Sequence, residues 1–214
     1  MNTKTQNPDT KDVIMSSDIE VASFIAIGAS AGGVNAVRTI LKMLRPIEDR
    51  VPIGVVQHLP AQARLDVGLI YGSRSANQIL EVEDKMPIEP GYVYMAAPGY
   101  HLLIEEDETF ALSQDEPVLH SRPSIDVFFE SVAQVYKNSC VGILLTGANS
   151  DGAKGLQAIA KMGGYTIVQD PSEAECAVMP QSAIHLNKPD RIYFLHEIAN
   201  FISSLAYSSL ERAP

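Results

Sequence analysis

Cysteine is scarce in this sequence of 214 residues, which contains only Cys140 and Cys176. The two residues are far apart and neither belongs to a Cys-x-x-Cys pair, so the sequence argues against a disulfide framework and a cysteine-based metal site. No pair of His, Cys, Asp or Glu residues has convincing metal-ligand spacing. We therefore expect two small, buried thiols.

Positive charge is also in short supply. Lys and Arg number 16 against 26 Asp and Glu, which leaves a net charge of −10. Nucleic acids and anionic membrane surfaces are bound by clustered basic residues, so both are disfavoured as partners. No apolar run approaches the roughly 18 residues of a membrane-spanning helix, and residues 1–20 lack the layout of a secretion signal. The sequence predicts a cytoplasmic protein without membrane insertion.

The remaining composition is that of a globular domain. Hydrophobic residues make up 46% of the chain and charged residues 20%, and the length suffices for one good-sized core. Residues 1–21 are polar, with few apolar side chains, and predict a disordered N-terminal tail. Residues 22–214 are predicted to form a single domain.

The first apolar run ends at a serine that stands between glycines. Residues 24–29 have the length of a buried strand, and the amphipathic segment 34–44 predicts a helix. The turn between them has the spacing Gly28-x-Ser30-x-Gly32, which is typical of a nucleophilic serine at a sheet edge. A phosphate cradle and a turn that merely packs a helix closely are alternatives. The phosphate site is disfavoured because Ser30 stands where a dinucleotide-binding loop has its second glycine.

His58 ends the next apolar run. Residues 52–58 predict a second strand, and the resulting βαβ unit predicts that the two strands are parallel. Parallel strands end at the same sheet edge, so Ser30 and His58 should lie close together. An imidazole beside a serine hydroxyl can act as the base that activates it, although a lone histidine after a strand is more often structural.

The middle of the chain consists of short apolar runs separated by proline and glycine: residues 79–82, 92–95, 101–104 and 110–112. This punctuation predicts an antiparallel hairpin appended to a parallel sheet, and the acidic segment 105–108 is predicted to be an exposed hairpin tip.

A helix capped by Ser124 follows these runs. Arg122, just ahead of it, could orient a carboxylate or carbonyl of a substrate, although such a residue is more often a surface ion-pair partner. His101, His120 and Asp126 are expected to be structural.

A third strand leads to candidate carboxylates. Residues 140–147 predict a buried strand that runs into a glycine turn, and Asp151 follows at the same sheet edge. A Ser–His pair needs a third group to orient the imidazole. Asp151, Asp66 and Asp170 are all candidates, and spacing alone does not choose among them; Asp151 could equally be a helix N-cap.

Four motifs occur in a fixed order: Ile-Gly-Ala-Ser-Ala-Gly-Gly, Val-Val-Gln-His-Leu-Pro, Ser-Arg-Pro-Ser-Ile-Asp-Val-Phe-Phe and Leu-Thr-Gly-Ala-Asn-Ser-Asp-Gly-Ala-Lys-Gly-Leu. With these motifs the chain, over about residues 22–205, resembles the catalytic domain of the CheB family of chemotaxis receptor methylesterases. The resemblance implies an α/β fold with a doubly wound, mostly parallel sheet flanked by helices and an antiparallel β-hairpin. It also implies that Ser30 is the nucleophile, His58 the base and Asp151 the orienting carboxylate.

The same resemblance implies a reaction. It is the hydrolysis of glutamate γ-methyl esters on chemoreceptors with release of methanol, together with deamidation of particular glutamines. Amide N–H groups near Ala31 and Ala148 would hold the oxyanion, and no metal or cofactor is required. The expected partners are a methylated chemoreceptor-like substrate and a separate regulator or methyltransferase, because the receiver domain common in the family has no counterpart here.

One departure from the family keeps other functions open. The usual Gly-Met-Gly is replaced by Gly147-Ala148-Asn149, and Asn149 takes the place of a glycine whose freedom to adopt positive φ would matter. A weakened turn at this place would fit a non-catalytic signalling module that keeps the fold. A nucleotide-binding protein that uses the glycines at residues 28–33 is a further alternative.

Overall fold

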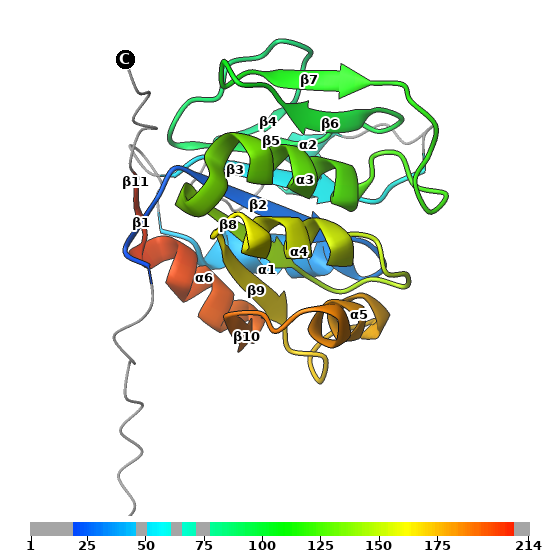
Figure 1. Cartoon of the computed structure of the whole chain (residues 1–214), viewed down its shortest axis with the longest axis vertical. Helices are drawn as coiled ribbons and strands as arrows, with labels where there is room; N and C mark the ends of the chain where they lie inside the picture. Colours follow the sequence, from blue (N-terminus) through cyan, green and yellow to red (C-terminus); the bar gives the residue numbers. More distant parts are fainter. Residues whose placement is uncertain (1–18, 46–50, 61–65, 72–77, 208–214) are drawn as a thin grey trace, which may run out of the picture.

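The computed structural model describes residues 19–45, 51–60, 66–71 and 78–207. They form an α/β fold built on a seven-stranded sheet (Figure 1). The predicted tail lies outside the described residues up to residue 18. Ile19 packs against the core and Val21 begins the first strand, so the last residues assigned to the tail are part of the fold.

The central sheet confirms the predicted parallel arrangement. Its strands lie in the order β10-β9-β8-β2-β3-β5-β4, and every neighbouring pair is parallel. The bounds are β2 (Phe24–Ala29), β3 (Ile53–Gln57), β4 (Gln78–Glu81), β5 (Tyr92–Met95), β8 (Cys140–Leu144), β9 (Tyr165–Gln169) and β10 (Arg191–Tyr193). From β8 the strands follow chain order outward to β9 and β10, whereas beyond β2 and β3 the strand β5 lies inside β4, which forms the edge. The sheet is therefore doubly wound, with its switch point between β2 and β8.

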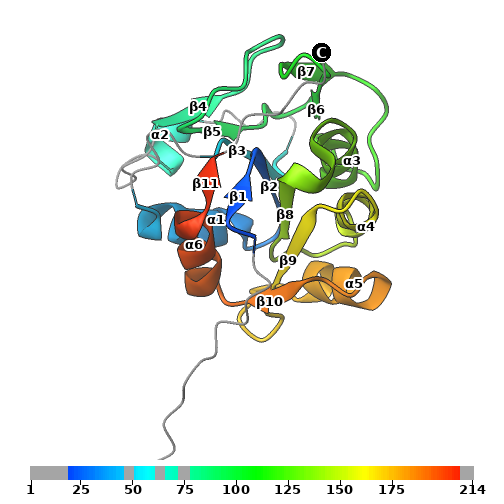
Figure 2. The same ribbon diagram turned by 60° about the vertical axis from the view of Figure 1, so that its left-hand side comes forward.

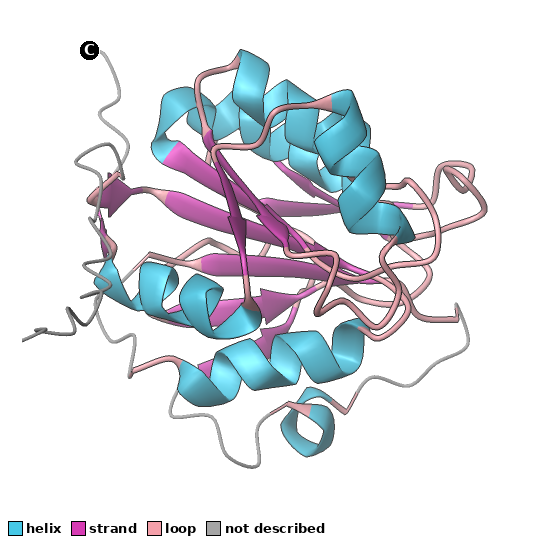
Figure 3. Cartoon of the chain, turned by 90° about the horizontal axis from the view of Figure 1, so that it is seen from below, coloured by secondary structure: helices cyan, strands magenta, loops and turns pink. Residues whose placement is uncertain are grey.

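Helices cover both faces of the sheet, as Figure 2 shows. One face carries α1 (Gly33–Met43), α6 (Leu195–Ser204) and the short α2 (Val67–Ile70). The other carries α3 (Ile125–Tyr136), α4 (Ala153–Lys161) and α5 (Val178–Leu186), and the 3₁₀ turn Lys137–Ser139 follows α3. Figure 3 shows the helix layers above and below the strands, with loops gathered at one side of the sheet.

The short apolar runs of the middle segment divide between two sheets. β6 (His101–Ile104) and β7 (Phe110–Ser113) form the predicted antiparallel hairpin. The other two runs, β4 and β5, instead extend the main sheet in parallel. Proline and glycine mark where strands end but do not choose their partners. The continuous burial of Val93, Tyr94 and Met95 is typical of a parallel strand covered on both faces.

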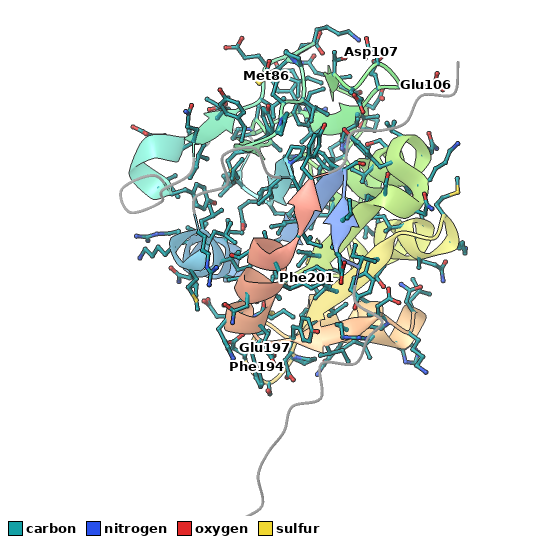
Figure 4. The ribbon with its side chains drawn as sticks, turned by 90° about the vertical axis from the view of Figure 1, so that its left-hand side faces the viewer. Met86, Glu106, Asp107, Phe194, Glu197 and Phe201 are labelled. Atoms are coloured by element: carbon teal, nitrogen blue, oxygen red, sulfur yellow. The ribbon has the colours of Figure 1, made fainter. Side chains whose placement is uncertain are left out.

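Exposed acidic side chains lie at the tip of the β6–β7 hairpin, as predicted. Glu106 and Asp107 lie at one end of the molecule in Figure 4, and Phe194 and Glu197 at the other. The carboxylate of Glu197 accepts a 2.8 Å hydrogen bond from the N–H of Phe194 and so caps α6.

A separate two-stranded sheet joins the two ends of the described fold. Its strands are β1 (Val21–Ala22) and β11 (Ala206–Tyr207), which pair in parallel.

Alternating side chains of β2 divide the core into two layers. Ile25 and Ile27 face α1 and α6, whereas Phe24 faces α3 and stacks on Tyr136 with ring centroids 5.0 Å apart. Gly54, on the neighbouring strand, lies beneath the rings of Phe24 and Phe128. A Cβ atom at Gly54 would lie 2.7 Å from ring atoms of both Phe24 and Phe128, so the close packing requires glycine there.

Replacing Gly54 by alanine should therefore destabilise the fold. The rigid rings of Phe24 and Phe128 have no room to move aside, so we expect Gly54→Ala to lower the free energy of unfolding by about 1–3 kcal/mol. Urea denaturation measures this change.

Gly142→Ala is the matched control on β8. Its added methyl group would meet side-chain ends of Ile159 and Leu156, at 2.6 and 2.8 Å. These flexible side chains can rotate away, so the loss should be smaller than at Gly54. Equal losses in the two variants would contradict the packing explanation.

Candidate active site

Ser30, His58 and Asp151 follow three neighbouring strands of the sheet. Ser30 comes directly after β2 and His58 directly after β3, and the last residues of these strands, Ala29 and Gln57, are in register. The N–H of His58 donates a 3.0 Å hydrogen bond to the carbonyl of Ala29. Asp151 lies beyond β8, on the other side of β2. The three side chains thus meet at the switch point, where open α/β sheets bind ligands.

The three side chains form a continuous hydrogen-bonded chain. Nδ1 of His58 lies 3.1 Å from Oγ of Ser30, and Nε2 lies 2.8 Å from Oδ2 of Asp151. An ionised carboxylate only accepts hydrogen bonds, so Nε2 carries the proton of neutral His58. Nδ1 is then left to accept the Ser30 hydroxyl. Such a chain can move a proton from the serine to the imidazole.

The two competing aspartates lie elsewhere. Asp170 accepts hydrogen bonds from the N–H and hydroxyl of Ser172, at 2.8 and 2.6 Å. Asp66 is exposed just before α2. Among the three candidates that spacing left open, the carboxylate that contacts His58 is therefore that of Asp151.

Asp151 is held at the N-terminus of α3. Its side chain is fully buried and accepts hydrogen bonds from the N–H groups of Ile125 (2.8 Å) and Asp126 (3.0 Å) and from the hydroxyl of Ser124 (2.9 Å). Burial by itself would raise the pKa of Asp151. The hydrogen bonds from His58 and from the helix N–H groups outweigh it and hold the pKa below its ordinary value. The carboxylate therefore stays ionised around neutral pH.

Ser124 has a second role that the sequence analysis missed. It caps α3 as predicted, by accepting from the N–H of Val127. Its hydroxyl also donates to Asp151, 27 residues away in the chain. Local spacing identifies a cap, but it contains no signal for a contact with a carboxylate from another strand.

Asp126 is the structural counterpart of Asp151. Its buried carboxylate accepts from the N–H groups of Gly152 (2.8 Å) and Gly155 (2.7 Å), at the start of α4. Asp151, which lies just before α4, thus binds the N-terminus of α3, and Asp126, in the first turn of α3, binds the N-terminus of α4. Burial is the main cause that raises the pKa of Asp126 to about 6; the negative charge of Asp151 adds to it and the bond from Gly155 opposes it.

Main-chain hydrogen bonds hold the serine turn in place. The N–H of Ser30 donates to the carbonyl of Thr146 (2.9 Å), and the hydroxyl of Thr146 donates to the carbonyl of Ala31 (2.8 Å). The side-chain amide of Gln57 donates to the carbonyl of Ser30 (2.8 Å). Thr146 and Gln57 were missed as supporting residues, although both stand within the quoted motifs.

The proposed oxyanion donors lie at the surface beside Ser30. Ala31 and Ala148 are both exposed, and within the described ranges their N–H groups donate no hydrogen bond to protein atoms. Asn149 is not among the described non-glycine residues with positive φ, so replacing the family's glycine by asparagine causes no left-handed backbone strain there. Its side-chain oxygen instead accepts from the N–H of Asp151 at 3.1 Å, which stabilises the turn.

A pocket of about 400 Å³ opens over Ser30 and His58, lined also by Leu59, Pro60, Pro117, His120, Ser121, Arg122, Pro123 and Asn149. Nη1 of Arg122 donates to the carbonyls of Gln114 (2.8 Å) and Asp115 (3.0 Å), so it anchors the pocket wall. A contact between Arg122 and substrate stays a prediction.

Ser121 also approaches the site, with its Oγ 3.4 Å from Nδ1 of His58. The sequence analysis missed this residue because nothing in its local sequence connects it to the histidine.

Over the part of the chain that the structure describes, no cluster of three or more His, Cys, Asp or Glu side chains is arranged to hold a metal ion. The thiol of Cys140 is buried and that of Cys176 half-buried, and neither forms a disulfide. In the same described ranges, no helix is long and apolar enough to cross a membrane.

The raised pKa of Asp126 predicts a pH dependence of stability. The folded state holds a proton on this carboxyl up to about pH 6, whereas the ordinary pKa is 3.8. Between these values the folded state binds more protons, so this group's contribution to stability decreases as the pH rises from about 4 to about 6. Asp126→Asn should remove this decrease, since its side-chain oxygen can still accept from Gly152 and Gly155. Urea denaturation across pH 4–7 tests this, and parallel profiles for the two proteins would refute it.

Comparison with known proteins gives a consistent result. The sequence model of the family described as CheB methylesterase matches residues 25–202. A Leptospira interrogans protein with the provisional name protein-glutamate methylesterase/protein-glutamine glutaminase is 47% identical over 188 residues, which cover 88% of this chain and 97% of that protein. A Symbiobacterium thermophilum protein-glutamate methylesterase/protein-glutamine glutaminase is 36% identical over 84% of this chain, but over only 49% of its own length. The crystal structure of the Thermotoga maritima CheB methylesterase catalytic domain superposes with a TM-score of 0.80 at 28% identity, covering 85% of this chain and 97% of that one.

Proposed function

The chain belongs to the CheB methylesterase family, and from this premise we propose that it is a serine hydrolase that demethylates glutamate γ-methyl esters on chemoreceptor-like proteins. The observation that carries the proposal is the chain of contacts from Ser30 through His58 to Asp151, at 3.1 and 2.8 Å. Deamidation of glutamines on the same substrates is part of the proposal, because relatives carry both activities in their names.

In the proposed mechanism, Ser30 attacks the ester carbonyl while Nδ1 of His58 takes the hydroxyl proton. The new C–O bond makes a tetrahedral intermediate, whose oxyanion accepts from the N–H groups of Ala31 and Ala148. Such a donor typically stabilises the transition state by about 3–4 kcal/mol. Asp151 stabilises the imidazolium that has formed.

The intermediate then breaks its bond to the methoxy oxygen. Nδ1 of His58 returns the proton to this oxygen, so methanol leaves and the glutamyl group stays on Ser30 as an ester. Water, deprotonated by His58, attacks this ester. Collapse of the second tetrahedral intermediate releases the glutamate and restores the Ser30 hydroxyl. With a glutamine substrate, the same steps release ammonia.

The two alternative classes receive less support. The binding-module hypothesis depended on a weakened turn at Asn149, and this residue adopts no positive φ. A phosphate at the glycine turn would meet the carboxylate of Glu175, since a Cβ at Gly32 would lie 3.0 Å from its Oε2. Charge repulsion there disfavours a nucleotide. A separate regulator or methyltransferase partner is compatible with the proposed enzyme.

Methanol release from membranes that carry [³H]methyl-labelled chemoreceptors tests the proposal. We expect release by the unmodified protein and a loss of at least about a thousandfold in Ser30→Ala, because the nucleophile is gone. Ser182→Ala is the matched control, since this hydroxyl lies on α5 and donates to the carbonyl of Val178. Release that persists in Ser30→Ala would eliminate Ser30 as the nucleophile. No release from the unmodified protein would refute the methylesterase.

A further inference from the structure

A tight turn at residues 118–121 forms one wall of the pocket. Val118 and Ser121 exchange two main-chain hydrogen bonds, of 3.1 and 2.8 Å. The two central residues, Leu119 and His120, both have positive φ, 47° and 65°. These features define a two-residue hairpin turn of the kind that strongly prefers Asn-Gly.

Leucine is a poor residue for this turn. Positive φ brings Cβ too close to the backbone, and a bulky side chain tolerates it worse than asparagine or glycine does. Burial does not compensate for this strain, because 49% of Leu119 is exposed. Neither backbone conformation nor core packing therefore explains a leucine at this position. Backbone strain that is retained in this way is a feature of functional sites.

The turn lies at the mouth of the pocket. Pro117 and His120, which flank the 118–119 segment, line the pocket together with Ser30 and His58. Ser121, at the end of the turn, places its Oγ 3.4 Å from Nδ1 of His58. Leu119 itself does not line the pocket, but it is exposed and directly precedes the lining residue His120, which places it at the outer edge, or rim, of this wall.

Two side chains hydrogen-bond to the backbone of residues 114–116, the segment that leads to the turn. Nη1 of Arg122 donates to the carbonyls of Gln114 and Asp115. The ring of the buried His101 accepts from the N–H of Ser124 through Nδ1, so its Nε2 donates to the carbonyl of Glu116, 3.1 Å away. A side chain presented from such a braced segment loses little freedom when it binds a partner.

We propose that Leu119 is a specificity-determining residue that packs against an apolar side chain of the protein substrate, next to the esterified glutamate. The inference rests on the proposed function, because it assigns to Leu119 the selection of a protein over a small ester. A small ester occupies only the pocket and does not reach the rim. A protein substrate extends over the rim and covers the exposed leucine.

Leu119→Asn tests this role, because the proposal predicts a change in substrate selection in addition to a change in stability. Asparagine suits the turn, so Tm should rise by about 2–4 °C. The value of kcat/KM for [³H]methyl-labelled chemoreceptor membranes, divided by that for p-nitrophenyl acetate, should fall about tenfold, equivalent to about 1.4 kcal/mol. A leucine with no part in substrate selection would show only the gain in stability, with the ratio unchanged.

Two further variants complete the test. Leu119→Met keeps an apolar side chain and should retain the ratio of the two kcat/KM values. Met162→Asn removes a comparably exposed apolar side chain, 46% accessible, at the end of α4, and should leave the ratio unchanged. An equal ratio in Leu119→Asn and in the unmodified protein would overturn the inference while the proposed function stands. Hydrolysis of p-nitrophenyl acetate without any receptor demethylation by the unmodified protein would refute the proposed function, and the inference with it.

Discussion

The carboxylate of Asp151 at the N-terminus of α3 is the contact on which the rest of the site depends. It accepts two helix N–H groups and the Ser124 hydroxyl, and its Oδ2 faces His58. A buried carboxylate is costly unless such donors surround it. The same donors that keep the carboxylate ionised also determine its position. The orientation of His58 toward Ser30 therefore follows from where α3 begins.

The site and the packing of α3 on α4 are coupled. Asp151, just before α4, accepts a hydrogen bond from the first turn of α3, and Asp126, in the first turn of α3, accepts hydrogen bonds from the start of α4. Together they couple the two helices that pack side by side over β2 and β8. A change in the packing of these helices would therefore move the carboxylate that faces His58. Activity and stability depend on the same hydrogen bonds.

Much of the fold was predictable from local patterns. Buried strands of apolar residues, each ending in a polar or glycine turn, identified the ends of β2, β3 and β8 and hence the sheet edge where Ser30, His58 and Asp151 lie. The partners of the short strands were not predictable. The 92–95 run and the 101–104 run are alike in length and punctuation, yet β5 joins the parallel sheet and β6 a hairpin. Strand pairing depends on which long-range partner buries both faces, and local sequence contains no such information.

The sequence by itself determined the residue types at the strand ends, the capping of α3 by Ser124 and, through its four motifs, the family that the chain resembles. Spacing alone left Asp66, Asp151 and Asp170 open, the resemblance implied Asp151, and the structure places the carboxylate of Asp151 against His58. Only the tertiary structure showed that Ser121 approaches the same imidazole and that Leu119 adopts a strained turn beside the pocket. The physical reason is distance along the chain. Periodicity and capping act over a few residues, whereas these contacts join segments 63 and 93 residues apart, which meet only when the sheet and its helices have packed.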